Sequence, residues 1–386
     1  MQKTKLENQR EDSRNAHSND DGRGPTQTIH RFFSRTHGIL VLAAVACALP
    51  AQSQAAIVVF DPPDAVSTMI GGINPEGTIT GGYRDANNDD HGFLRTLDGQ
   101  FTTFDAPGAL SAFPQGATIN SAGVITGTYG KYAGSDPFFG TFYTISGFLR
   151  LADGTTFNID PPPAYSSFPA AINDEGTIAG SYGAAQDGSN HFYVRAADGT
   201  FTEFDPEPGA RPASIGINPE GTLTGSYLDS NFIPHSFVRT ARGTITLFDA
   251  PDAVNGTAAS SISPSRAITG YYVDSNNNAH GFLRNWQGHF TTFDPQGSIS
   301  TYPSGIAPNG AIAGNYNDVN YQSHGFVRAK NGKITTFDPQ SSMSTIVTGI
   351  NPGGVISGYY FDANFNTHGF VFQTDADDES HGANSD

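Results

Sequence analysis

Tyrosine, histidine and aspartate recur together along the chain, and side chains of these three types could exchange protons or hold a metal ion. The clearest copies of the set are Tyr83/His91/Asp105, Tyr272/His280/Asp294 and Tyr316/His324/Asp338. Antiparallel hairpins would place each histidine across from its tyrosine and near its aspartate. A catalytic site usually lies where one copy differs from the others, whereas buried polar groups need partners in every copy. We therefore interpret the set as a structural clamp, together with the arginines that recur beside it: Arg95, Arg150, Arg195, Arg239, Arg284 and Arg328.

Aspartate and asparagine also occur two, four and six residues after several of the tyrosines. Three triplets show this spacing: Asp85, Asn87 and Asp89; Asp274, Asn276 and Asn278; and Asp362, Asn364 and Asn366. Oxygen ligands on alternate residues resemble the first half of a calcium loop, but the central glycine and the terminal glutamate of such a loop are missing. Tight hairpin loops favour Asp and Asn for their own geometry, which is the competing explanation. We favour this explanation and predict no cofactor, with calcium as the alternative.

One copy departs from the pattern, because its segment Gly130–Tyr143 is longer than its counterparts and Ser146 replaces the histidine. The aromatic residues of this segment are Tyr132, Phe138, Phe139, Phe142 and Tyr143. Connecting segments elsewhere add Phe113, Phe168, Arg211 and Tyr302. Exposed aromatic side chains either pack or bind something, so the segment is either a plug over its own repeat or a platform for a sugar or a peptide. In the second case these nine residues would form the ligand site.

Other catalytic signatures are missing from the sequence. It has no G-x-S-x-G elbow, no H-E-x-x-H helix and no phosphate-binding glycine loop. The only cysteine is Cys47, near the N-terminus, so the chain beyond it can form no disulfide and has no thiol nucleophile. Carboxylates are plentiful, but no pair stands out as an acid–base couple.

A repeated unit must position these residues. A Gly-x-Tyr pair recurs once in each of seven repeats, and the successive repeat tyrosines are 46, 53, 45, 45, 44 and 44 residues apart, which indicates an array of one supersecondary unit. Each copy reads as four short strands, which in the first copy are Thr68–Ile73, Thr78–Tyr83, His91–Thr96 and Phe101–Asp105. Asn74-Pro75-Glu76-Gly77 and Asp98-Gly99 have the composition of hairpin turns. We therefore predict a four-stranded antiparallel sheet per repeat.

Seven such sheets are expected to form a ring. Adjacent apolar residues such as Phe93 and Leu94 point to opposite faces, so each sheet needs a neighbour on both sides. We predict an all-β, seven-bladed β-propeller over residues 56–373. Its N-terminal strand, Ile57–Asp61, should complete the last blade, since His368–Phe372 is a third strand with no fourth strand after it. The glycine of each second strand should let bulky residues of the adjacent sheet press against the backbone.

The repeats resemble those of two families. Their register is similar to that of WD-type propellers, and they resemble more closely the HAF-family extracellular repeat proteins, which are named for a His-x-Phe core. Here that core reads His91-Gly92-Phe93, His235-Ser236-Phe237, His280-Gly281-Phe282, His324-Gly325-Phe326 and His368-Gly369-Phe370. The resemblance implies an exported bacterial repeat protein, and it implies no particular activity.

The two ends of the chain are predicted to lie outside the propeller. Residues 1–55 combine a polar extension with a secretion signal, in which arginines precede an apolar run, Gly38–Pro50, and Ser53-Gln54-Ala55 is the cleavage site. The apolar run is too short to span a membrane. Residues 374–386 form an acidic tail that we expect to be disordered. The signal predicts a secreted or periplasmic protein.

Charge narrows the choice of partners. Residues 1–55 contain 7 of the 20 basic and 5 of the 37 acidic residues, so the chain after Ala55 has 13 basic and 32 acidic residues. This excess argues against nucleic acid and against anionic membranes as partners, and it favours cations and neutral or basic partners.

We predict a monomeric, non-enzymatic binding or scaffold module whose glycan or protein ligand lies on the face that carries the longer loops. The alternatives are a polysaccharide lyase or hydrolase with its site at the channel mouth of that face, and a calcium-stabilised structural surface protein.

Overall fold

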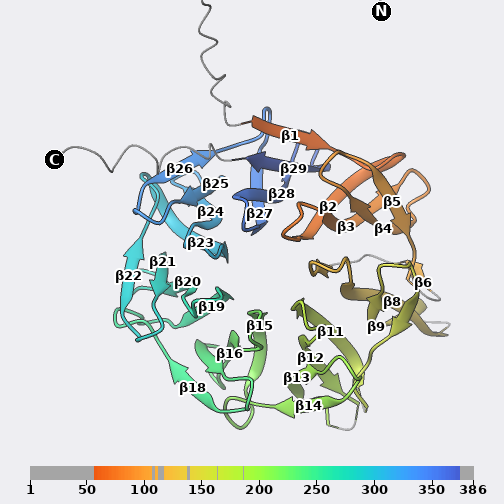
Figure 1. Cartoon of the computed structure of the whole chain (residues 1–386), viewed down its shortest axis with the longest axis horizontal. Coiled ribbons are helices and arrows are strands. Elements are labelled where there is room, and N and C mark those ends of the chain that lie inside the picture. The colour runs from red at the N-terminus through yellow and green to blue at the C-terminus, as the bar shows by residue number, and fades with distance from the viewer. Residues whose placement is uncertain are drawn as a thin grey trace, which may run out of the picture. The chain divides into compact units, whose positions relative to one another are not determined.

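Seven antiparallel sheets are arranged in a ring (Figure 1). The computed structural model describes residues 56–106, 109–111, 117–136, 140–162, 164–185 and 187–373, all of which belong to one compact unit, Gln52–Asp386. Every regular element in these ranges is a β-strand. The predicted seven-bladed β-propeller is therefore confirmed.

Each blade runs from an inner first strand to an outer fourth strand. The first blade consists of β2 (Ala65–Ile73), β3 (Ile79–Asp85), β4 (Asp90–Arg95) and β5 (Phe101–Phe104). The second consists of β6 (Ala109–Ser111) with β7 (Thr118–Ile119), β8 (Ile125–Asp136), β9 (Gly140–Arg150) and β10 (Thr156–Asn158). The third consists of β11 (Ala164–Ile172), β12 (Ile178–Ala184), β13 (Asn190–Arg195) and β14 (Phe201–Phe204). The fourth and fifth are β15 (Arg211–Ile217), β16 (Leu223–Leu228), β17 (Pro234–Arg239) and β18 (Ile245–Phe248); and β19 (Thr257–Ile262), β20 (Ile268–Val273), β21 (Ala279–Arg284) and β22 (Phe290–Phe293). The last two are β23 (Ser298–Ile306), β24 (Ile312–Asp318), β25 (Ser323–Arg328) and β26 (Ile334–Phe337); and β27 (Ser344–Ile350), β28 (Val355–Phe361), β29 (Thr367–Gln373) and β1 (Ala56–Phe60).

The ring closes through the N-terminal strand, as predicted. β1 pairs antiparallel with β29, with Val59 opposite Phe370. Phe60 then packs against Phe93 of the first blade, at a ring-centroid distance of 6.5 Å, and the Arg95 guanidinium stacks over the Phe60 ring at 4.4 Å. A strand from the start of the chain therefore joins the last blade to the first and covers the edge of β29.

The core lies in and between neighbouring blades. The position four residues before each repeat tyrosine is Ile or Leu and is fully buried in every blade, as at Ile79. The expectation about the second-strand glycine is wrong in one respect, because the tight contacts come from its own blade. A Cβ added to Gly81 would lie 2.2 Å from the Met69 carbonyl oxygen and 2.9 Å from the Phe93 ring. The glycine is needed because Phe93 of the third strand folds back across it.

Two polar arrays link neighbouring blades. The recurring arginines stack on a phenylalanine of the preceding fourth strand, at 4.4–5.1 Å, in the pairs Arg95/Phe60, Arg150/Phe104, Arg239/Phe204, Arg284/Phe248 and Arg328/Phe293. Asparagines in the turns between first and second strands each donate a side-chain N–H to a backbone carbonyl of the next blade, at 3.1–3.5 Å. These asparagines are Asn74, Asn120, Asn173, Asn218 and Asn351. Both arrays agree with a structural role for these residues.

The hairpin topology gives the ring two different faces. Loops between second and third strands, and the crossovers between blades, share one face, which we call the long-loop face. Turns between first and second strands, and between third and fourth strands, share the opposite face, the short-turn face. No helix in the described part of the chain is long and apolar enough to cross a membrane.

Candidate functional site

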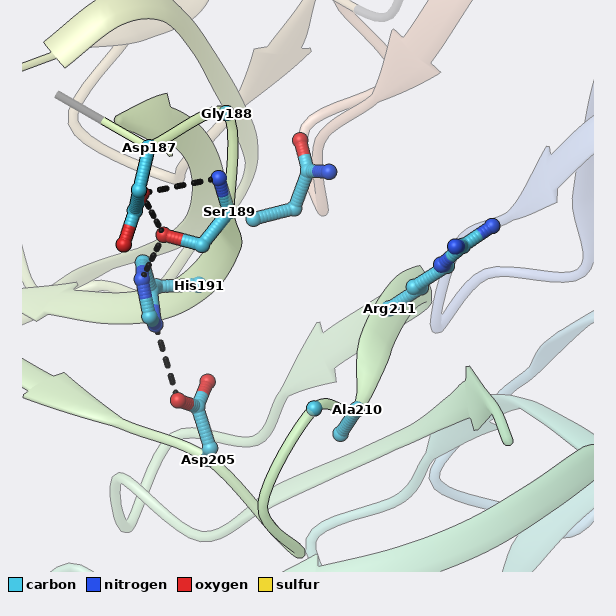
Figure 2. Close-up of a pocket in the computed structure, with 9 residues that line it drawn as sticks. Asp187, Gly188, Ser189, His191, Asp205, Ala210 and Arg211 are labelled. Atoms are coloured by element: carbon cyan, nitrogen blue, oxygen red, sulfur yellow. Dashed lines mark hydrogen bonds and ion pairs between the residues drawn. The ribbon is translucent and has the colours of Figure 1, made fainter. Parts of the chain in front are cut away.

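The long-loop face is hollowed at the junction of the third and fourth blades. The outer hollow, which we call the junction pocket, has a volume of about 440 Å³, and its lining is Asp187, Gly188, Ser189, Asn190, His191, Asp205, Gly209, Ala210 and Arg211 (Figure 2). A second hollow of about 440 Å³, the inner pocket, adjoins it through Asn190 and Arg211 and has Phe168, Phe192 and Ile215 among its lining residues. Pockets of this size suit small ligands or single side chains of a larger partner.

The predicted Tyr–His–Asp clamp is present in six blades. In the first blade, Tyr83 lies opposite His91 in the strand register, their rings are 5.1 Å apart, and the imidazole Nδ1–H donates to the Asp105 carboxylate at 2.8 Å. The Nδ1-to-carboxylate distances are 2.7–2.8 Å for the pairs His91/Asp105, His191/Asp205, His235/Asp249, His280/Asp294, His324/Asp338 and His368/Asp61. This repetition fits a structural role for the shared part of the network.

In the third blade the imidazole Nε2 has a different partner from that in the other blades. In five blades the imidazole Nε2 faces an aspartate of the loop between the second and third strands, at 3.5–3.9 Å. In the third blade Ala184 occupies that aspartate position, and the Ser189 hydroxyl lies 2.6 Å from His191 Nε2 instead. The result is a continuous chain from Ser189 Oγ through the imidazole to Asp205 Oδ2 (Figure 2).

Asp187 holds the serine in place. Its Oδ1 accepts the Ser189 backbone N–H at 3.0 Å and lies 2.6 Å from the Ser189 hydroxyl. These hydrogen bonds lower the pKa of Asp187, the serine hydroxyl contributing most. A serine hydroxyl has one proton, so it can donate to Asp187 or to His191 at any moment, but not to both.

Asp205 lacks a partner that its counterparts have. At three other junctions the same aspartate accepts a threonine hydroxyl through Oδ1, at 2.5–2.6 Å, in the pairs Asp61/Thr68, Asp294/Thr301 and Asp338/Thr345. Pro212 takes the threonine position here, and the buried Oδ1 of Asp205 has no hydrogen-bond partner among the described residues. Buried acceptors are normally hydrogen-bonded, so this unpaired oxygen distinguishes the third blade from the three junctions that have the threonine.

Glu203 adds a third carboxylate to this junction. It occupies the fourth-strand position of Thr103 and accepts a hydrogen bond from the Tyr182 hydroxyl. Burial, followed by this hydrogen bond, raises the pKa of Tyr182 well above its ordinary value. Ligand atoms of His191, Glu203 and Asp205 lie within 4.8 Å of one another, so the three could share a metal ion. A metal would have to replace the existing hydrogen bond between His191 and Asp205.

The predicted calcium triplets lie in the loops between second and third strands, where the leading aspartate already bonds its own loop. Asp274 Oδ1 accepts the backbone N–H groups of Asn276 and Asn278 at 2.8 and 2.9 Å, and Oδ2 accepts the Asn276 amide at 3.2 Å. In the first blade, Asp85 Oδ1 accepts the backbone N–H groups of Asn87 and Asp89, both at 2.8 Å.

The last blade repeats this arrangement. Asp362 Oδ1 accepts the backbone N–H groups of Asn364 and Asn366 at 2.8 and 2.9 Å. Four of the predicted ligands are exposed to solvent, and each donates its backbone N–H to the leading aspartate of its loop: Asn87, Asp89, Asn364 and Asn366. The physical reason is that an aspartate at the start of a tight loop stabilises the turn by accepting the N–H groups two and four residues later.

These bonds explain the spacing of the triplets without a metal. The one group of acidic and histidine side chains with metal-ligand spacing in the described ranges is His191, Glu203 and Asp205, which contains no triplet residue. Calcium binding stays a prediction, and a melting temperature that does not respond to calcium or to a chelator would exclude it.

The predicted ligand residues are only partly brought together. Phe168 and Arg211 both line the inner pocket, whereas Tyr302 lies in the sixth blade with its ring 5.1 Å from that of Tyr271. Backbone pairing places Tyr132 opposite Tyr143, and Phe142 beside them, in the hairpin of β8 and β9, so part of the expected loop is a two-stranded extension. Phe113, Phe138 and Phe139 lie outside the described residues. The plug and the platform both stay predictions.

Three aromatic residues at loop tips escaped the sequence analysis. Phe232, Tyr321 and Phe365 are 62%, 79% and 75% exposed, and all have positive φ angles, of 61–64°. Asn88 and Asn277 hold the same place in other blades, where the residue closes an i, i+3 turn and adopts a left-handed backbone. Asparagine tolerates this conformation, whereas a bulky aromatic residue there is unusual. The tips therefore present aromatic rings to solvent on the long-loop face, and the Arg211 guanidinium stacks 4.6 Å from the Phe232 ring.

Charge also separates the two faces. Loops and crossovers of the long-loop face have 18 acidic side chains among the described residues, against two arginines, Arg84 and Arg211. Turns of the short-turn face, together with the recurring arginines beside them, have 7 acidic and 10 basic side chains. Most of the excess negative charge of the ring therefore faces one way.

Single-position departures from the repeat could have revealed the third blade. Tyr182 and His191 are nine residues apart, whereas the other tyrosine–histidine pairs are eight apart. Glu203 and Pro212 stand where several other repeats carry threonine, such as Thr103 and Thr68 of the first blade.

Comparison with solved structures supports the fold. A catalytically inactive variant of virginiamycin B lyase from Staphylococcus aureus, solved with quinupristin, is 16% identical in sequence with a TM-score of 0.58, and the match covers 83% of this chain and 100% of the lyase. A lectin from Burkholderia pseudomallei is 9% identical with a TM-score of 0.53, and the match covers 81% of this chain and 99% of the lectin. No protein-family model and no curated protein matches the sequence, so the resemblance to HAF-family proteins has no independent support. The chain is similar to an enzyme and to a lectin in fold alone.

Proposed function

We propose that this chain is a binding module whose long-loop face holds a cationic ligand, best met by a lysine- or arginine-rich segment of another protein. The observation that carries this proposal is the coincidence of 18 acidic side chains and three exposed loop-tip aromatics on the same face. Carboxylates attract and orient a basic partner. Aromatic faces add contact area and attract ammonium and guanidinium groups.

The exposure and the backbone conformation of the loop-tip aromatics indicate a role in binding and not in folding. A ring that is 75–79% exposed buries little surface, and its backbone conformation suits asparagine better. Two blades use asparagine at the same place, so the turn itself does not require an aromatic residue. The arginine contact at Phe232 also provides an example of a cation stacked on one of these rings.

Export is the second part of the proposal. The leader Arg31–Ala55 would direct the chain out of the cytoplasm, in keeping with the resemblance to HAF-family extracellular proteins. Mass spectrometry of the chain recovered from the periplasm or medium would test this. A mature N-terminus at Ala56 supports export, and an intact leader on all of the recovered protein contradicts it.

The binding proposal is tested with two panels, an array of basic, acidic and neutral peptides and an array of glycans. We expect binding to lysine- and arginine-rich peptides that weakens as salt rises from 50 to 500 mM. The triple variant Phe232→Asn, Tyr321→Asn and Phe365→Asn should lose most of it. Trp286→Asn is the matched control, since Trp286 is a similarly exposed aromatic (68%) on the short-turn face.

The outcomes separate the possible ligands. Binding to neutral glycans that does not respond to salt and is lost in the triple variant would support the long-loop face as the binding surface. The same result would overturn the proposal that the ligand is cationic. Binding that the tip substitutions leave unchanged, or no binding on either panel, would overturn the proposal as a whole.

A further inference from the structure

We propose that Ser189, His191 and Asp205 form a nucleophilic hydrolytic site that cleaves small uncharged or cationic carboxylic esters in the junction pocket. Such an activity goes beyond ligand binding and does not depend on it. The carrying observation is the chain of contacts from Ser189 Oγ to His191 Nε2 at 2.6 Å and from His191 Nδ1 to Asp205 Oδ2 at 2.8 Å (Figure 2). A serine, a histidine and an aspartate in this order of contact are the parts of a catalytic triad, which is identified by geometry and not by sequence order.

The histidine has the tautomer that this chemistry needs. Asp205 is a carboxylate and can only accept, so Nδ1 carries the proton and the neutral imidazole presents a free lone pair at Nε2. In five other blades Nε2 faces an aspartate carboxylate, which has no hydroxyl proton to give. Among the described blades, only the third places a hydroxyl there, so only there can the clamp activate a nucleophile.

The serine is positioned and open to a substrate. Asp187 holds the Ser189 backbone through its N–H, and Ser189, Asn190 and Arg211 all line the junction pocket. Arg211 extends away from the His191–Asp205 pair (Figure 2), which keeps space open above the serine. The Asn190 amide and the Arg211 guanidinium are the side-chain donors that line this pocket and could stabilise a carbonyl oxygen as it gains negative charge.

The pocket also indicates the class of ester. Its volume of about 440 Å³ admits a small acyl group, and the adjoining inner pocket offers the apolar side chains of Phe168, Phe192 and Ile215. Asp187 and Asp205 both line the pocket, so an anionic substrate would be repelled.

The reaction balances with water as the only co-reactant. Ser189 Oγ attacks the ester carbonyl carbon while its proton passes to His191 Nε2, and the π electrons move to the carbonyl oxygen. Collapse of this tetrahedral species breaks the ester C–O bond, and the departing alkoxide takes the proton from Nε2. Water, deprotonated by the same nitrogen, then cleaves the acyl–Ser189 ester. The products are a carboxylic acid, an alcohol and the free serine.

The test uses the full chain with p-nitrophenyl acetate and butyrate, and with a fluorophosphonate probe that reacts with activated serines. We expect hydrolysis above the buffer rate and a phosphonylated peptide that contains Ser189. Ser189→Ala should reduce kcat/KM on the order of 10³-fold or more and abolish labelling, and Asp205→Asn should lower both. The matched control is His280→Ala, which removes the same clamp from the fifth blade, where no serine faces the imidazole, and should keep full activity.

Circular dichroism and a thermal melt of each variant separate loss of chemistry from loss of fold. If Asp205→Asn unfolds the ring, Ser189→Ala still decides, because it removes only one hydroxyl from the surface of a pocket. Wild-type hydrolysis no faster than that of Ser189→Ala, with no label on Ser189, would overturn the proposal and make the third blade another structural clamp. Ligand binding on the long-loop face would survive that result.

Discussion

The loop-tip aromatics offer the sharpest test of the link between sequence, stability and function. Tyr321 and Phe365 occupy a left-handed turn position that two other blades fill with asparagine. We expect Tyr321→Asn and Phe365→Asn to leave the fold intact, to keep or raise its stability, and to weaken ligand binding. An aromatic residue that served the fold would behave in the opposite way.

The magnitude follows from two opposing terms. Tyr321 is 79% exposed, so about a fifth of its side chain is covered, which is roughly 40 Å² and about 1 kcal/mol at ~25 cal/mol/Å². Against this loss, a residue that tolerates positive φ recovers about 1–2 kcal/mol of backbone strain. The net change in the free energy of unfolding should therefore lie between zero and about 1 kcal/mol of stabilisation for each substitution.

Urea unfolding followed by tyrosine fluorescence or circular dichroism measures this change, with Asn277→Tyr as the reverse substitution in the fifth blade. We expect Asn277→Tyr to destabilise the ring by a similar amount. A loss of more than about 1 kcal/mol on Tyr321→Asn would refute the reasoning, because it would mean that the ring packs in solution and is not held out for a partner.

Three further predictions concern the ring itself. Asn120→Ala removes two buried hydrogen bonds, one of them to the Asn173 carbonyl of the next blade, and should lower the free energy of unfolding by about 2–3 kcal/mol in a urea titration; a loss below 0.5 kcal/mol would show that this belt does not join the blades. Burial opposes protonation of His280, but the hydrogen bond and charge of Asp294 outweigh it and raise the His280 pKa. Wild type should therefore be most stable relative to His280→Ala below about pH 6.5, and this advantage should decline as pH rises through the raised pKa; an advantage that grows with pH would contradict the assigned charge. Phe60→Ala opens the closing contact between the last and first blades and should cost about 3–4 kcal/mol in the same titration, whereas a change within 1 kcal/mol would mean that the ring does not depend on this contact.

Much of the architecture could be predicted because it is repeated. A residue pattern written seven times fixes strand length, turn type and burial in each copy, and errors in one copy are corrected by the others. The lone strand at one end and the missing strand at the other then determined how the ring closes, since an unpaired edge would leave its backbone groups without partners. Pairing of Tyr83 with His91 followed directly from hairpin geometry.

Side-chain contacts between the repeated elements were harder to predict from the sequence. The glycine before each tyrosine was expected to accommodate a neighbouring sheet, yet Phe93 of its own blade covers Gly81. Sequence periodicity shows that a side chain is missing, but not which rotamer of which neighbour fills the space. The stacking of Arg95 on Phe60 is similar, because those residues meet only after the ring has closed.

The alternating Asp and Asn residues show a second limit of the same kind. The spacing of Asn87 and Asp89, or of Asn364 and Asn366, predicts oxygen ligands, and the same spacing serves the hydrogen bonds that their backbone N–H groups donate to Asp85 and Asp362 in the folded loops. A residue pattern does not reveal whether a side chain or its own backbone makes the contact.

The sequence by itself therefore determined the fold class, the number of blades and the pairing of tyrosine, histidine and aspartate in six of them, because each of these follows from the repeated pattern. Only the tertiary structure decided where the repeats stop being equivalent. It brought Ser189 to within 2.6 Å of His191, left Asp205 Oδ1 without a donor beside Pro212, and gathered acidic side chains and aromatic tips on one face. The physical reason is that such a site depends on distances between side chains of different strands and loops, such as His191 and Asp205, and only the folded ring sets those distances.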